Sequence, residues 1–153
     1  MKIIDLLTQD RPTLSFEVFP PKTSDTYDSV AKATQEIAAL RPDFMSVTYG
    51  AGGGTSDYTV NIAAGISQTY GVDVLPHLTC VSSTREHVAK VLDQLKEKGI
   101  QNVLALRGDI PEGGAPAHDS PDAAQRAKDI QAHGDFCNGG ACYPEGHPES
   151  PTK

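Results

Sequence analysis

A regular alternation of strand and helix patterns predicts a parallel α/β sheet of the (β/α)8 barrel type. Short apolar runs with strand character recur five times, and helical periodicity fills the intervals between them. The first four runs end in polar residues, and a barrel gathers the carboxyl ends of its strands around one mouth. Right-handed crossovers are compatible with a doubly wound sheet as well as with a barrel. The polar residues at the strand ends favour the barrel.

The number of strands predicts an incomplete barrel. A closed barrel typically needs about 250 residues, whereas the sequence has 153. About the first five strands and four helices are therefore expected. We expect residues 1–153 to form one partial barrel domain, truncated at its C-terminus.

The first strand is expected at residues 14–19. It alternates as Leu-Ser-Phe-Glu-Val-Phe and meets Pro20 and Pro21, which cannot donate to a sheet and so end it. Glu17 lies near this end. A surface carboxylate on an edge strand is the simple interpretation, but the polar ends of the other strands favour a functional Glu17.

The remaining elements follow from periodicity and from their start and stop residues. In order, they are a helix over about 24–40, a strand at 44–49, a helix at 57–70, a strand at 72–79 with Pro76 as a misfit, a helix from the Ser83–Glu86 capping box to Gly99, a strand at 102–106, a helix at 122–132 and a weak strand at 135–143.

Alternation along each strand predicts which side chains share the face that carries Glu17. In each strand the polar residues come last, so we expect Glu17, Thr48, His77 and Asp109 to meet at one rim. The full set expected on this face is Ser15, Glu17, Ser46, Thr48, Leu75, His77, Thr79, Val103, Ala105, Arg107 and Asp109.

Composition excludes several classes of protein. The net charge of −7 argues against a general nucleic-acid or anionic-membrane surface. No apolar run approaches the roughly 20 residues of a membrane-spanning helix, and the N-terminus lacks the pattern of a signal peptide. Three cysteines, an odd number, are most simply reduced thiols. We expect a cytoplasmic protein without nucleic-acid or membrane partners.

Three local motifs favour simple interpretations. The glycine-rich run 50–54 lacks the lysine of a phosphate-binding loop and is better explained as a βα loop. Arg107-Gly108-Asp109 fits a cofactor site at a strand end better than an adhesion tripeptide, because glycine lets a ligand approach the backbone. No metal is predicted, because the candidate ligands lack the close Cys-x-x-Cys spacing of structural zinc. Those candidates are His133, Cys137, Cys142 and His147.

Five short blocks, in order and at compatible spacing, resemble the methylenetetrahydrofolate reductase family. They span nearly the whole chain and correspond to about the first half of that family's catalytic barrel. The blocks are Ser-Phe-Glu-Val-Phe-Pro-Pro-Lys (15–22), Ser-Val-Thr-Tyr-Gly-Ala (46–51), His-Leu-Thr-Cys (77–80), Leu-Arg-Gly-Asp (106–109) and Tyr-Pro-Glu-Gly-His-Pro-Glu (143–149).

The resemblance implies a flavoprotein. Its FAD would be reduced by NADH or NADPH and would pass a hydride to 5,10-methylenetetrahydrofolate, giving 5-methyltetrahydrofolate for one-carbon and methionine metabolism. The flavin carries the redox chemistry, and the protein orients and tunes it. The resemblance also implies a small-molecule folate substrate and, for a full-length family member, a homo-oligomer. The preference between NADH and NADPH stays open.

The resemblance also assigns roles to residues. Glu17 aligns with the general acid that assists opening of the folate ring to an iminium ion. Asp109 aligns with the acid beside flavin and folate, where its charge would stabilise that cation. Thr48 falls where the family meets the nicotinamide. The positions aligned with FAD contacts are Tyr49, His77, Arg107, Gly108, Asp109, Ala127, Tyr143 and His147.

Two features depart from the family pattern. Arg126-Ala127 stands where the family has a Tyr-Ala pair, in a helix that looks about one turn short. The chain also ends soon after His147, before the later cofactor and folate contacts. Two alternatives therefore stay open: a non-catalytic half-barrel that binds flavin, and a fragment that assembles with a separate second half. An aldolase-type barrel is disfavoured, because no predicted strand ends in a catalytic lysine.

Overall fold

The computed structural model describes residues 1–21, 26–49, 56–79, 83–108 and 123–146. These form five strands and five helices, which alternate after the first helix. In chain order they are α1 (Ile3–Leu7), β1 (Ser15–Val18), α2 (Tyr27–Ala38), β2 (Phe44–Val47), α3 (Ser56–Tyr70), β3 (Asp73–Thr79), α4 (Arg85–Glu97), β4 (Asn102–Leu106), α5 (Ala123–His133) and β5 (Cys137–Gly140).

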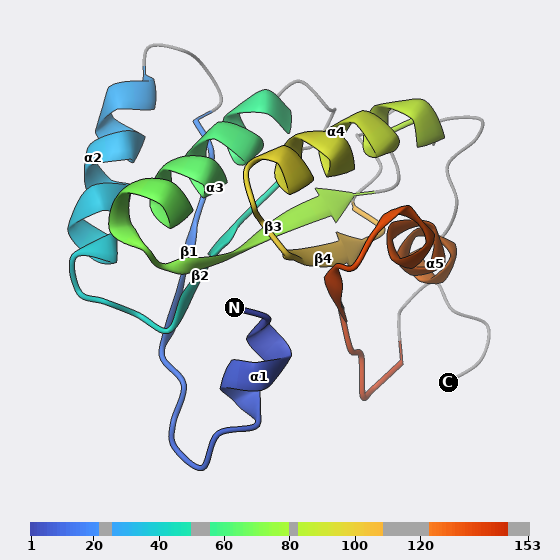
Figure 1. The fold of residues 1–153 in the computed structure, drawn as a ribbon, viewed down its shortest axis with the longest axis horizontal. Helices are drawn as coiled ribbons and strands as arrows, with labels where there is room; N and C mark the ends of the chain where they lie inside the picture. Colours follow the sequence, from blue (N-terminus) through green and yellow to red (C-terminus); the bar gives the residue numbers. More distant parts are fainter. Residues whose placement is uncertain (22–25, 50–55, 80–82, 109–122, 147–153) are drawn as a thin grey trace.

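The five strands form one parallel sheet in the order of the sequence, β1-β2-β3-β4-β5. A doubly wound sheet would reverse its strand order at a switch point, and this sheet has no reversal. Helices α2, α3 and α4 cover one side of the sheet, and α5 packs beside β4 and β5 (Figure 1). The prediction of a partial (β/α)8 barrel is confirmed.

The two faces of the sheet differ in their burial. Residues that point toward the helices form the core with side chains of α3, α4 and α5, and Met45, Val47, Leu78 and Val103 have no exposed surface. On the opposite face, which a complete barrel would enclose, Leu75, Leu104 and Leu106 are only half-buried. We call this second side of the sheet the open face.

An ion pair fixes β1 against β2. The guanidinium of Arg11 lies 2.5 Å from Asp43 Oδ1, and the Leu14 amide donates to Asp43 Oδ2 at 2.8 Å. These contacts lower the pKa of Asp43 to about 2, with the Arg11 hydrogen bond as the main cause. They hold the starts of the two strands together, and the register that follows places Glu17 opposite Ser46.

The expected face of β4 is wrong by one residue. His77 pairs with Leu104 and Thr79 with Leu106, so Leu104 and Leu106 share the open face with Glu17. Val103 and Ala105, which we expected there, lie in the core under the helices. Every residue of this strand except Asn102 is apolar, so alternation of polarity gave no reliable sign of which side points inward.

Two details at helix starts also differ from expectation. The N-cap of α4 is Thr84, whose hydroxyl accepts from the His87 amide at 3.2 Å, and Ser83 is buried one residue earlier. Helix α1 was not expected, because it is only five residues long and no side chain caps its N-terminus. Within the described ranges, no helix combines the length and the apolar character needed to cross a membrane.

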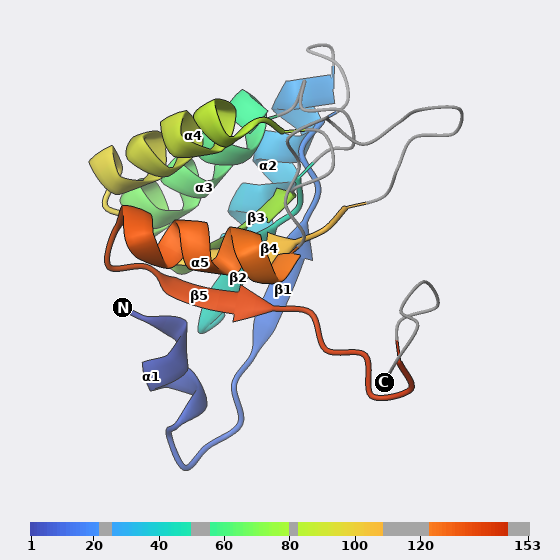
Figure 2. The same ribbon diagram turned by 90° about the vertical axis from the view of Figure 1, so that its right-hand side faces the viewer.

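Helix α1 lies below the sheet, away from α3 and α4 (Figure 2). Asn102, the first residue of β4, attaches it. Its side chain accepts from the Ile3 amide at 2.8 Å and donates to the carbonyls of Met1 and Val74 at 3.0 and 3.3 Å. Asn102 is only 2% exposed, and its bonds to Ile3 and Val74 are buried, so these two backbone groups would otherwise lose a partner away from water.

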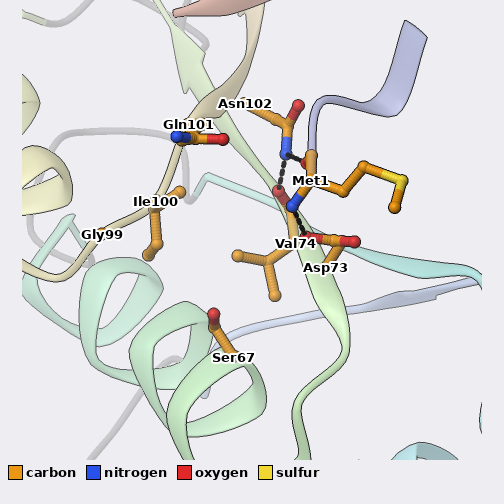
Figure 3. A pocket seen from close by; sticks show the side chains of 8 residues that line it. All are labelled: Met1, Ser67, Asp73, Val74, Gly99, Ile100, Gln101 and Asn102. Atoms are coloured by element: carbon orange, nitrogen blue, oxygen red, sulfur yellow. Dashed lines mark hydrogen bonds and ion pairs between the residues drawn. The ribbon is translucent and has the colours of Figure 1, made fainter. Parts of the chain in front are cut away.

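A small hollow lies beside this attachment (Figure 3). Its volume of about 10 Å³ is barely enough to hold one water molecule. The hollow lies at the amino ends of β3 and β4, opposite the strand ends expected to carry chemistry. It is therefore a packing defect and not a cofactor site. The lining residues are Met1, Ser67, Asp73, Val74, Gly99, Ile100, Gln101 and Asn102.

Replacing Asn102 by aspartate should destabilise the fold. Asn102→Asp keeps an acceptor for the Ile3 amide, but it removes both N–H donations and places a charge in a buried position. We expect the free energy of unfolding to fall by about 2 kcal/mol, measured by urea unfolding followed by circular dichroism. Gln101→Glu makes the same chemical change at an exposed neighbouring position. Equal urea midpoints for the two variants would contradict this role of Asn102.

The chain by itself should associate. Within the described residues, β1 and β5 each have one strand neighbour, and the open face has no covering layer. Unpaired strand edges and half-buried leucines favour contact between copies. We expect size-exclusion chromatography of the 153-residue chain to show oligomers or aggregates. A monomer with a sharp, cooperative calorimetric transition would show that the open face needs no partner.

Candidate active site

Glu17, Ser46 and His77 meet on the open face, near the carboxyl ends of β1, β2 and β3. The Ser46 hydroxyl donates to Glu17 Oε2 at 2.9 Å, and His77 Nε2 lies 3.4 Å from the same oxygen. Ser46 is 9% exposed, while the Glu17 side chain is 46% exposed. The carboxyl group is therefore held from the sheet side and remains open toward the space above the sheet.

His77 lies deeper than Glu17. Its side chain is 10% exposed. Burial lowers the pKa of His77 below its ordinary value, and the nearby Glu17 carboxylate opposes this effect without reversing it. Near neutral pH the imidazole is therefore uncharged. At 3.4 Å from Glu17, its Nε2 makes no hydrogen bond within the described residues, and the neutral ring adds no second charge to the site.

Thr48 and Tyr49 follow directly after β2 but lie on different sides. Thr48 continues the open face, and its amide and carbonyl are held by the Val18 carbonyl and the Thr59 hydroxyl, both at 3.0 Å. The Tyr49 ring is buried in the core, with its hydroxyl 3.1 Å from His87 Nε2. Of the two, only Thr48 lies on the face that carries Glu17.

Gly108 lies beside Thr79, just beyond the ends of β4 and β3. Its φ is +81°, and a Cβ at this position would be 2.9 Å from Thr79 Cβ. Both the backbone conformation and the space therefore require glycine. Arg107 is half-buried, and its Nε donates to the Gly108 carbonyl at 3.3 Å. The ends of β3 and β4 are thus packed closely together, with the Arg107 guanidinium group bonded to the same backbone.

Helix α5 carries Ala127 and an unexpected buried cation. Ala127 packs against the core, and its carbonyl accepts from Asn138 at 3.1 Å. The neighbouring Arg126 has no exposed surface; its Nη2 donates to the Ser83 carbonyl at 3.4 Å, and Nη1 lies 3.9 Å from Asp129. Sequence reasoning gave no sign of this burial, because arginine is normally exposed.

Of the remaining predicted site residues, the structure describes only Tyr143. Tyr143 follows β5 and is 54% exposed. Asp109 and His147, together with the glycine-rich run 50–54, lie outside the described residues. His133, a candidate metal ligand, bonds Asp93 at 2.8 Å instead. Across the described part of the chain, no three potential ligands are grouped closely enough to hold a metal ion.

Fold and site together define a class of protein. The chain is part of a (β/α)8 barrel in which a carboxyl group, a hydroxyl group and a neutral imidazole meet near the carboxyl ends of adjacent strands, where barrel enzymes keep their chemistry. In this arrangement the carboxyl group can hold a proton and donate it to a ligand above the sheet.

The chain belongs to the methylenetetrahydrofolate reductase family, whose sequence profile matches residues 2–153. It is 41% identical over 143 residues to 5,10-methylenetetrahydrofolate reductase of Pectobacterium carotovorum subsp. carotovorum, covering 93% of this chain and 47% of the relative. It is 35% identical over 159 residues to methylenetetrahydrofolate reductase (NADH) 1 of Arabidopsis thaliana, covering 97% and 27%. The chain thus spans about half or less of these relatives.

Solved structures show the same fold at low sequence identity. A 2,3-dimethylmalate lyase aligns with a TM-score of 0.54 and 9% identity, over 86% of this chain and 46% of that one. The muconate lactonizing enzyme of Pseudomonas fluorescens aligns with a TM-score of 0.51 and 13% identity, over 86% and 32%. At such low identity these likenesses support the architecture alone.

Removing the charge of Glu17 should make His77 harder to protonate. In Glu17→Gln the carboxylate no longer favours the imidazolium ion, so the pKa of His77 should fall further. The unfolded chain takes up this proton at about pH 6.5, so the stability lost below that pH should be larger in the variant. Titration of the His77 ring signals by NMR measures the change. Glu97→Gln, an exposed change on α4, is the control. An unchanged or higher His77 midpoint in Glu17→Gln would contradict the assigned contact.

Proposed function

We propose that this chain supplies the first part of the catalytic barrel of an FAD-dependent methylenetetrahydrofolate reductase. The reaction is reduction of 5,10-methylenetetrahydrofolate to 5-methyltetrahydrofolate by NAD(P)H. The observation that carries the proposal is the contact of Glu17 with Ser46 and His77 on the open face, in a chain that belongs to this family. Several relatives are named as NADH enzymes, which favours NADH as the reductant.

The described residues fit a flavin. Gly108 packs against Thr79 and holds the ends of β3 and β4 together, at the edge where a flat ring system would lie. Arg107 and His77 offer hydrogen-bonding groups beside it, and Thr48 is assigned to the nicotinamide. When bound, FAD would supply the hydride chemistry. Tyr49, Ala127, Tyr143, Asp109 and His147 are assigned to FAD by family resemblance.

The role of this chain's own residues is to hold and move a proton. Protonated Glu17 would give its proton to the ring nitrogen of the folate that leaves the methylene carbon. The O–H bond and the methylene C–N bond break, and an N–H bond forms. The other ring nitrogen gives its lone pair to the methylene carbon, which makes an iminium cation whose charge the carboxylate balances. Asp109 is assigned to stabilise this cation. Reduction of flavin by NADH needs no such proton donor.

The test uses this chain joined to the remaining sequence of the Pectobacterium relative. The purified protein should take up FAD, seen in its visible spectrum. Glu17→Gln should slow folate reduction by about 10²- to 10⁴-fold, the usual contribution of general acid catalysis. Anaerobic stopped-flow traces of the two half-reactions separate this loss from flavin reduction by NADH, which should persist. Glu97→Gln is the matched control.

Two results would overturn the proposal. A colourless protein that takes up no added FAD would contradict the cofactor assignment. Equal loss of both half-reactions in Glu17→Gln would mean that Glu17 is structural.

A second candidate function follows from the open face and the unpaired edges of β1 and β5. A half-barrel of this kind would bind flavin without turnover, or assemble with a separate second half. This alternative predicts that the 153-residue chain binds flavin but does not reduce folate. It also predicts that folate reduction appears when the second half is added as a separate polypeptide.

A further inference from the structure

Glu17 and His77 lie on strands that are not neighbours. β2 separates the two strands by two strand spacings, about 9–10 Å, and the register sets Glu17 level with Leu75, two residues before His77. The carboxyl group must therefore reach across β2 to come within 3.4 Å of His77 Nε2. The residue beneath this crossing is Ser46, which pairs with Glu17 in the register of β1 and β2.

Ser46 makes the crossing possible in two ways. Its side chain is small, so it leaves room above β2 for the carboxyl group. Its hydroxyl also donates to Glu17 Oε2 at 2.9 Å, the oxygen that faces His77. Ser15, two residues before Glu17 on the same strand face, is exposed, and within the described residues the hydroxyl that bonds Glu17 is that of Ser46. The contact therefore depends on position 46 and not on the general presence of serines.

The two contacts distinguish the oxygens of Glu17. Oε2 receives the Ser46 hydroxyl and lies against His77, whereas Oε1 has no hydrogen-bond partner among the described residues. Because Oε2 already accepts the hydrogen bond from Ser46, a proton on Glu17 is better placed on Oε1. The partly exposed carboxyl group then directs this proton away from the sheet.

We propose that Ser46 is a positioning residue for Glu17, which holds Oε2 against His77 so that Oε1 carries the transferable proton. This inference rests on the proposed function, because it assigns Glu17 as the proton donor. In the reaction the Oε1–H bond breaks and the proton moves to the leaving ring nitrogen. The resulting carboxylate keeps its Ser46 hydrogen bond, which is stronger to a charged acceptor.

The kinetic test distinguishes the effect of the hydroxyl group at position 46 from the effect of side-chain shape. In the joined protein, Ser46→Ala should slow folate reduction by about tenfold or more, as expected for a lost hydrogen bond to a charged group, and should spare flavin reduction by NADH. Ser46→Thr keeps the hydroxyl and should restore most of the rate, whereas Ser46→Val has nearly the shape of threonine and should not. Ser15→Ala is the control on the same face.

A second measurement needs no activity and uses the 153-residue chain. Among the described groups, Glu17 is the charge that acts on His77. Glu17→Gln should change the pH midpoint of the His77 titration seen by NMR. The size of this change therefore reports how closely the carboxyl group is held to His77. If Ser46 holds it, this shift should be clearly smaller in a Ser46→Ala background than in a Ser15→Ala background.

Each outcome supports or overturns the inference. It stands if Ser46→Ala and Ser46→Val lose folate reduction selectively and the His77 shift shrinks. It falls if Glu17→Gln slows folate reduction but spares flavin reduction, while Ser46→Ala does not show this selective loss. The proposed function would then remain intact. It also falls if both half-reactions decline equally in Ser46→Ala, or if the His77 shift is the same in both backgrounds. If Glu17→Gln is not selective, the proposed function and this inference fail together.

Discussion

The register of β1 on β2 is the constraint on which the site depends. Arg11, Asp43 and the Leu14 amide hold the two strand starts together, and from there Glu17 necessarily meets Ser46. A slip of one residue would turn Glu17 toward the helices, because successive side chains point to opposite faces. An ion pair at one end of the sheet thus determines which groups meet near the other end, without contacting any of them.

The same sheet has one face for stability and one for chemistry. The helix-covered face supplies the buried core around Met45, Val47 and Val103, so the open face can carry a carboxyl group, a hydroxyl group and an imidazole. Within the described residues, no further layer covers the open face. Its half-buried leucines would lie inside a closed barrel.

Local patterns predicted most of the fold. The strands around Glu17 and His77 alternate in polarity, and the helices after α1 could be recognised from their apolar spacing and their start and stop residues. The face of β4 could not be predicted, because Val103, Leu104 and Ala105 are equally apolar and only the pairing with β3 decides between them. Of the site, the meeting of Glu17 with His77 was predictable from strand ends. The burial of Arg126 depends on contacts with Ser83 and Asp129, and only three-dimensional packing creates these.

The attachment of α1 has a consequence for the order of folding. The Ile3 amide bonds to a residue 99 positions later in the chain, the side chain of Asn102. Contacts of such long sequence separation form late, because a large loop must close before they stabilise anything. During synthesis the first helix must therefore wait until β4 has left the ribosome. Until then, Asp73 at the amino end of β3 lacks its contact with the N-terminal amino group of Met1.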